Sequence, residues 1–83
     1  MNLEREKLAS IVSKNLKKYR KEKNLSQLKV AAKAGVHFTY YSQVERKLRP
    51  DISVRLLLRI ADALDITLND LVYDWDGDFI DSP

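Results

Sequence analysis

The chain has 83 residues, which is enough for one domain with a small core but not for a large catalytic cleft. It contains no cysteine and a single histidine, His37, which excludes disulfides, thiolate metal sites and a zinc site built from histidines alone. Apolar residues make up 45% of the chain and recur at helical spacing. We therefore expect an all-α bundle that holds no metal and no cofactor.

Charge is divided sharply along the chain. Residues 1–59 contain all 15 lysines and arginines and five acids, a net charge of +10, whereas residues 60–83 contain seven aspartates and no base, a net charge of −7. A basic body attracts a polyanion, and the acidic end would be repelled from it and should point away. The N-terminal sequence MNLEREKLAS mixes charges and lacks a continuous apolar run. We expect no signal peptide, no membrane span and a cytoplasmic location.

The first predicted helix covers about 3–23. One of its faces is apolar apart from Asn15, and the other members of that face are Leu8, Ile11, Val12, Leu16 and Tyr19. Lysine and arginine fill the remaining faces. A cluster of these cations lies in the last turns, where positive charge is favourable near the C-terminal end of the helix dipole without any ligand. The cluster is therefore weak evidence of binding by itself.

Residues 25–46, LSQLKVAAKAGVHFTYYSQVER, contain two short helical patterns that meet at a single glycine. Ser26 is a suitable N-cap for the first helix, and Gly35 ends it because a left-handed turn residue is least costly as glycine. The second helix starts at about His37. Ala31, four residues before Gly35, is also small, so we expect the two helices to cross closely. This spacing is typical of a helix-turn-helix and indicates DNA as the ligand.

A loop with Pro50 follows at 47–52, and Ser53 can cap a helix that carries two apolar stripes. The first stripe should face the core, and it consists of Val54, Leu57, Leu58, Ala61 and Leu64. The second stripe consists of Leu56, Ile60 and Ala63. It indicates either a partner subunit or a central helix that is buried on all sides.

The end of the chain combines a short helix with an acidic segment. Thr67 and Asp70 resemble a capping box that opens a helix at 68–73. After it, Trp75, Phe79 and Ile80 stand among aspartates, and such residues need a groove on their own domain or on a second subunit. We divide the chain into a helix-turn-helix domain at 1–73 and an acidic C-terminal tail at 74–83.

Several short motifs occur together. They are Arg20, LSQ at 25–27, Ala31, AGV at 34–36, TYYSQVER at 39–46, LLRIADALDI at 57–66, Leu68 and Leu71. With these motifs the chain from about 11 to 72 resembles the Cro/repressor-type, or Xre, helix-turn-helix family, and within it the controller proteins of restriction-modification systems. The resemblance implies a compact five-helix, lambda-repressor-like DNA-binding domain and a structural ion pair between Arg20 and Glu45.

Three features depart from the family pattern. Lys47 replaces the glycine that usually follows the ER dipeptide, the loop before residue 54 is about one residue longer, and Phe38 occupies a position that is often polar or arginine. The first two departures affect the shape of the loop, and the third affects what the protein reads.

In a helix-turn-helix the second helix enters the major groove with its N-terminal residues nearest the bases. The predicted base contacts are Phe38, Thr39, Tyr40 and Gln43. Gln43 is the best reader because its amide both accepts and donates, as the N6 and N7 atoms of adenine require. Thr39 suits a base or a thymine methyl. Phe38 could offer only apolar contact, for example with a thymine methyl. The alternative is that its ring packs against the preceding helix.

Phosphate contacts are expected around the same helix. The candidates are Gln27, His37, Arg46, Lys47 and Arg49, with Gln27 at the positive N-terminal end of the preceding helix. The last three also fit an ordinary solvated loop. Tyr40 and His37 should face outward, whereas Tyr41 and Val44 share the inward face, with the Tyr41 hydroxyl kept in water.

These residues predict a sequence-specific, DNA-binding transcriptional regulator that binds a palindromic operator as a homodimer. The predicted dimer interface comprises Leu56, Ile60, Ala63 and Trp75. Such a protein represses a promoter by covering it, or activates it through contact with RNA polymerase. The alternatives are an antitoxin or a protein-interaction module that uses the same fold with little or no specific DNA binding. An enzyme is the least supported class, because the chain offers no assembled nucleophile and base.

Overall fold

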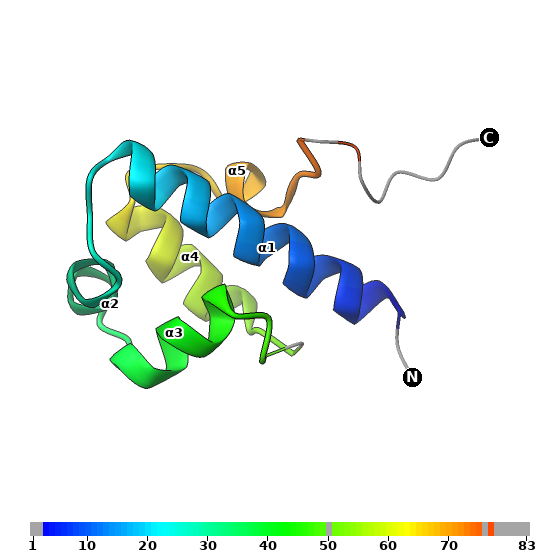
Figure 1. The fold of residues 1–83 in the computed structure, drawn as a ribbon, viewed down its shortest axis with the longest axis horizontal. Coiled ribbons are helices and arrows are strands. Elements are labelled where there is room, and N and C mark those ends of the chain that lie inside the picture. Colours follow the sequence, from blue (N-terminus) through cyan, green and yellow to red (C-terminus); the bar gives the residue numbers. More distant parts are fainter. Residues whose placement is uncertain (1–2, 50, 76, 78–83) are drawn as a thin grey trace.

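The computed structural model describes residues 3–49, 51–75 and 77, and the regular elements within these ranges are all helices (Figure 1). α1 covers Leu3–Glu22, α2 Gln27–Ala34, α3 Phe38–Glu45, α4 Val54–Ala63 and α5 Leu68–Val72. The predicted helices match these bounds to within about two residues, the margin expected at helix ends. The all-α, five-helix fold is therefore confirmed. Phe79 and Ile80 lie outside the described residues.

Local signals fix where three of the helices begin. The hydroxyls of Ser26 and Ser53 each accept a hydrogen bond from the backbone N–H three residues on, at 3.0 and 3.1 Å. At α5 the capping box is complete, because the Thr67 hydroxyl accepts from the Asp70 N–H while the Asp70 carboxylate accepts from the Thr67 N–H. These bonds satisfy N–H groups that have no partner within the helix, and they confirm the predicted caps.

One apolar core joins the helices. α1 packs against α3 and α5, α2 packs against α3 and α4, and α4 also packs against α5. Figure 1 shows α3 and α5 on opposite sides of α1. The most deeply buried core residues are Val12, Leu16, Val30, Ala31, Tyr41, Val44, Leu57, Ile60, Ala61, Leu64 and Leu71. Full burial of a large aliphatic side chain stabilises a fold by about 1.5 to 3 kcal/mol, so this core supplies the main driving force.

Asn15, the polar residue on the core face of α1, holds the end of α5. Its Nδ2 atom donates to the carbonyl oxygens of Leu71 and Tyr73 at 2.8 and 2.9 Å. The last carbonyls of a helix lack partners within it, so this amide satisfies groups that the short α5 leaves open. The bonds also fix the direction in which the chain leaves α5.

The two stripes predicted for α4 are right only in part. Val54 and Leu58, expected in the core, are 59% and 50% exposed, whereas Ile60 from the second stripe is fully buried. The buried face of α4 comprises Leu57, Ile60 and Ala61, followed by Leu64 after the helix. The helix is therefore turned about its axis so that its core face lies between the two stripes, and it is not buried on all sides.

Candidate nucleic-acid interface

Gly35 makes the turn between α2 and α3. Its φ is +69°, and its N–H and that of Val36 donate to the carbonyls of Ala32 and Ala31 at 3.2 and 3.0 Å. A Cβ built on Gly35 would meet nothing within 4 Å. Glycine is thus needed for the left-handed backbone, as predicted, but not for a close crossing of the two helices, and that part of the prediction is wrong.

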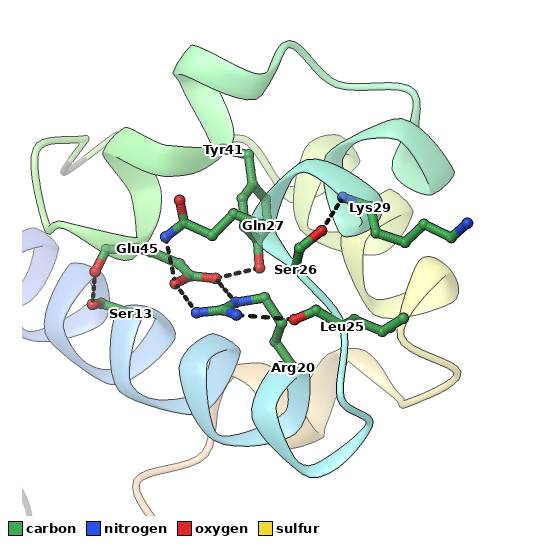
Figure 2. A network of polar contacts seen from close by, with 8 residues as sticks. All are labelled: Ser13, Arg20, Leu25, Ser26, Gln27, Lys29, Tyr41 and Glu45. Carbon is green, nitrogen blue, oxygen red and sulfur yellow. Dashed lines mark hydrogen bonds and ion pairs between the residues drawn. The ribbon is translucent and has the colours of Figure 1, made fainter.

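An ion pair holds α3 against α1, as the resemblance implies. Arg20 Nε donates to Glu45 Oε2 at 2.7 Å and Arg20 Nη2 donates to Oε1 at 3.1 Å (Figure 2). The hydrogen bond to Glu45 raises the pKa of Arg20. Nη1 of the same guanidinium donates to the Leu25 carbonyl at 2.9 Å. Arg20 therefore fixes both the end of α3 and the segment that leads into α2.

Two more donors complete the surroundings of the Glu45 carboxylate. The Tyr41 hydroxyl donates to Oε2 at 2.5 Å, and Gln27 Nε2 donates to Oε1 at 2.9 Å (Figure 2). Burial by itself would raise the pKa of Glu45, but the hydrogen bonds from Arg20, Tyr41 and Gln27 outweigh burial and lower that pKa. Burial and the bond to Glu45 raise the pKa of Tyr41. The carboxylate is thus buried, ionised and fully satisfied.

These bonds correct one prediction and bear on another. The Tyr41 side chain is fully buried, so its hydroxyl lies in the polar cluster around Glu45 and not in water. Gln27 Nε2 donates one of its two hydrogens to Glu45 and keeps the other, so the predicted phosphate contact of Gln27 stays a prediction. The physical reason is the same for both, because a buried carboxylate is costly unless every acceptor site finds a donor.

The N-terminal part of α3 presents its other side to solvent. His37, Phe38 and Thr39 are exposed, and Phe38 is 44% exposed, so its ring is not buried against α2. His37 is the N-cap residue of α3 but makes no capping bond with its side chain. The end of α3 that should approach bases is therefore accessible, while Tyr41 and Glu45 anchor the helix from behind.

Gln43 and Tyr40 of α3 form a second group with Arg49, which lies in the loop after that helix. Arg49 Nε donates to Gln43 Oε1 at 2.8 Å, and the Arg49 guanidinium lies 4.9 Å from the centre of the Tyr40 ring. Tyr40 packs partly against the core, and burial raises its pKa, so its predicted outward orientation is right only in part. The structure brings together one predicted phosphate contact and two predicted base contacts.

The loop after α3 carries the remaining predicted phosphate contacts at the surface. Arg46, Lys47 and Arg49 are all exposed. Lys47 has a φ of +63°, the left-handed conformation that glycine adopts at lower cost, which agrees with the glycine usual at this position in the family it resembles.

The predicted dimer residues have different environments. Ile60 is fully buried within one chain, so it belongs to the core and cannot contact a partner subunit, which corrects that prediction. Leu56 and Ala63 are half-buried, and Ala63 packs against the core. Trp75 is 45% exposed and its ring centre lies 4.5 Å from that of Tyr73. Exposed apolar surface therefore remains on α4 and just after α5.

Within the described ranges, no group of three or more histidine, cysteine, aspartate or glutamate side chains could hold a metal ion. No helix of that part of the chain is long and apolar enough to cross a membrane.

The sequence is similar to known regulators. The family model described as "Helix-turn-helix" matches residues 16–71. The HTH-type transcriptional regulator SinR of Bacillus licheniformis is 35% identical over 66 residues, which cover 80% of this chain and 60% of the relative. SinR of Bacillus subtilis is 36% identical over 62 residues, covering 75% and 56%. The control protein C.SmaI of Serratia marcescens is 35% identical over 65 residues, covering 78% and 76%.

The chain spans less than two thirds of the length of either SinR protein. No solved structure matches it significantly.

Proposed function

The chain belongs to the Xre-type helix-turn-helix family of regulators, and we propose that it binds a palindromic DNA operator as a homodimer and thereby controls transcription. The relatives that it resembles are regulators and not enzymes. Membership of the family supports DNA binding. The arrangement of α3 supports recognition of base edges by the exposed N-terminal end of that helix.

One observation carries the proposal. α3 is fixed from behind by Tyr41 and Glu45, whereas Phe38 and Thr39 at its N-terminal end are exposed. Contacts to base edges discriminate only when the reading residues are held in a fixed geometry, and a rigidly anchored helix with an open N-terminal end meets that requirement. Thr39 and Gln43 would then meet base edges, with Phe38 and Tyr40 adding apolar contact.

Phosphates on either side of the groove would be held by residues that flank α3. His37 precedes the helix, and Arg46, Lys47 and Arg49 follow it, all exposed. The first turn of α2 adds backbone N–H groups at the positive end of a helix. Such contacts fix the position of the protein on the duplex and carry no sequence information themselves.

Apolar surface on α4 and after α5 supports a homodimer. Leu58 and Trp75 are about half exposed, and Leu56 is half-buried on the other flank of α4. Exposed apolar side chains of this size are candidates for an interaction surface. A two-fold dimer places its recognition helices about one turn of DNA apart, roughly 34 Å, and therefore reads a palindrome.

Regulation would follow from occupancy of the operator. Binding over a promoter represses it, and binding beside a promoter activates it through contact with RNA polymerase. Such a regulator acts at the chromosome, in line with the cytoplasmic location expected from the sequence.

A salt titration tests DNA binding. The affinity for a random-sequence duplex should fall linearly on a logarithmic scale as salt rises, with a slope set by the number of phosphates contacted. Arg49→Ala should lower the affinity and the slope, whereas Arg59→Ala, at an exposed position on α4, should change neither. Absence of binding even at about 50 mM salt would contradict the proposal and would favour a protein-interaction module or an antitoxin.

A further inference from the structure

A surface pocket lies between α1 and the loop that follows α3. Its volume is about 360 Å³, and its lining residues are Lys14, Lys17, Lys18, Lys21 and Lys47. The four lysines of α1 follow the spacing i, i+3, i+4 and i+7, so they share one face of that helix. Ser13, beside them, donates a hydrogen bond to the Glu45 carbonyl and so holds the end of α3 next to this face (Figure 2). Lys47 follows two residues after Glu45 and lines the same pocket. We call this site the lysine pocket.

Three of the five lysines of the pocket have no partner for their charge within the part of the chain that the structure describes. All of its lining residues are lysines, and the side chains of Lys17, Lys21 and Lys47 make no hydrogen bond or ion pair there. Lys18 lies over the rings of Tyr19 and Trp75, at 5.3 and 5.9 Å from their centres. Lysines at positions i and i+4 of a helix repel each other. An anion bound between them would offset this repulsion through its attraction to each ammonium group.

The backbone at Lys47 gives an independent reason to look for a ligand. Three residues other than glycine have a positive φ, namely Asn24, Lys47 and Asp65. Asparagine and aspartate are enriched in the left-handed region, whereas lysine is not. The chain therefore keeps a lysine at a position where glycine would fit without strain, and the side chain of that lysine lines the pocket. Strain of this kind is typical of binding sites.

We propose that the lysine pocket binds linked phosphate groups, supplied either by a soluble polyphosphate or by the DNA backbone beside the recognition helix. Ammonium groups are compact point charges that suit phosphate without requiring one fixed geometry. Several of them around one opening select a ligand with several negative charges over a single anion. The volume is in the range of small-ligand sites. Four of the five residues belong to α1, outside the helix-turn-helix, so the site is distinct from the base-reading face.

Calorimetric titration with tripolyphosphate at about 0.15 M salt tests the pocket. The wild-type chain should bind with saturation. Lys47→Gly should weaken binding about fivefold, which is the effect of losing one unit charge about 4 Å from the ligand in water. The variant should still fold, because glycine adopts a positive φ without strain. Lys17→Gln should weaken binding in the same way. Two variants serve as controls. Asn24→Gly is the control for Lys47→Gly, because it also places glycine at a residue with positive φ but removes no charge. Lys33→Gln is the control for Lys17→Gln, because it removes one positive charge at an exposed position on α2, outside the pocket.

Unchanged binding in both control variants, with weaker binding in Lys47→Gly and Lys17→Gln, would support the pocket. No saturable binding, or an equal loss in Lys33→Gln, would overturn it, because affinity would then follow net charge alone. A duplex titration separates the two sources. If Lys17→Gln also weakens DNA binding and tripolyphosphate competes with DNA, the phosphates come from DNA; if DNA affinity is unchanged, they come from a soluble polyphosphate. Failure of the proposed operator binding would leave the tripolyphosphate result standing.

Discussion

Arg49 holds the side chain of Gln43 from the loop that follows the recognition helix, through a hydrogen bond of 2.8 Å between Nε and Oε1. One oxygen lone pair of the amide is thereby engaged, and the Nε2 group is left to donate. An amide held in one orientation loses less freedom when it binds. The residue proposed to read a base is therefore positioned by a residue proposed to contact phosphate.

Replacing Gln43 with alanine should relax the sequence preference at one base pair in each half-site. The expected loss of discrimination is about 1 to 3 kcal/mol, the usual value of a well-formed contact between an amide and a base edge. Competition binding with operators altered one base pair at a time measures it. An equal loss of affinity for every DNA sequence would show that Gln43 does not read bases.

Tyr41→Phe should lower the free energy of unfolding by about 1.5 to 3 kcal/mol, because a buried carboxylate loses one of its donors. Urea denaturation measures the change. Tyr40→Phe is the matched control, since this half-buried tyrosine on the same helix has no hydrogen bond through its hydroxyl, and its effect should stay within about 0.5 kcal/mol. Similar effects of the two substitutions would mean that the bond to Glu45 contributes little.

Glu45 should make stability depend on pH in the acid range. Its pKa in the folded chain is lower than the usual value of 4.5, so the unfolded state binds more protons. The stabilisation is present above the unfolded pKa and is lost as the pH falls through the folded pKa. Against Glu45→Gln, the wild type should be more stable by about 3 to 5 kcal/mol near neutrality.

Denaturation of both proteins at several pH values measures this dependence. The difference between wild type and Glu45→Gln should shrink steadily from about pH 6 to about pH 3. A difference that stays constant over that interval would contradict the assignment of an ionised, hydrogen-bonded Glu45.

Local sequence was sufficient to predict the helix ends, because caps and turns act over a few residues. Ser26, Ser53 and Gly35 have the roles expected of them. The partners of Gln27 and Tyr41 were not predictable in this way. Both donate to the carboxylate of Glu45. This carboxylate is buried by the packing of α3 against α1 and α2, and burial is what makes it require hydrogen-bond donors from the protein.

The orientation of α4 shows the same limit. Its sequence carries two apolar stripes, and either could face the core. The neighbours of the helix decide between them, and they bury Ile60 while leaving Leu58 half exposed. A periodic pattern therefore predicts that a helix is amphipathic, but where two stripes compete the rotation of the helix about its axis depends on tertiary packing.

Substitutions on the two kinds of position in α4 should separate core from interface. Ile60→Glu should unfold the chain, because it places an unpaired charge in the core. Leu56→Glu should leave the chain folded and convert dimers to monomers. Circular dichroism reports folding and sedimentation reports mass, with Leu28→Glu, 62% exposed on α2, as the control that changes neither. A folded Leu56→Glu variant that remains dimeric would place the interface elsewhere.

Selection of bound sequences from a random DNA library at roughly physiological salt, followed by footprinting of the selected sequence, tests the central claim most directly. The account predicts a palindromic motif with both half-sites protected and their centres about one helical turn, roughly 34 Å, apart. Salt-sensitive binding without an enriched motif, or protection of a single isolated half-site, would contradict the proposed dimeric, sequence-specific regulator.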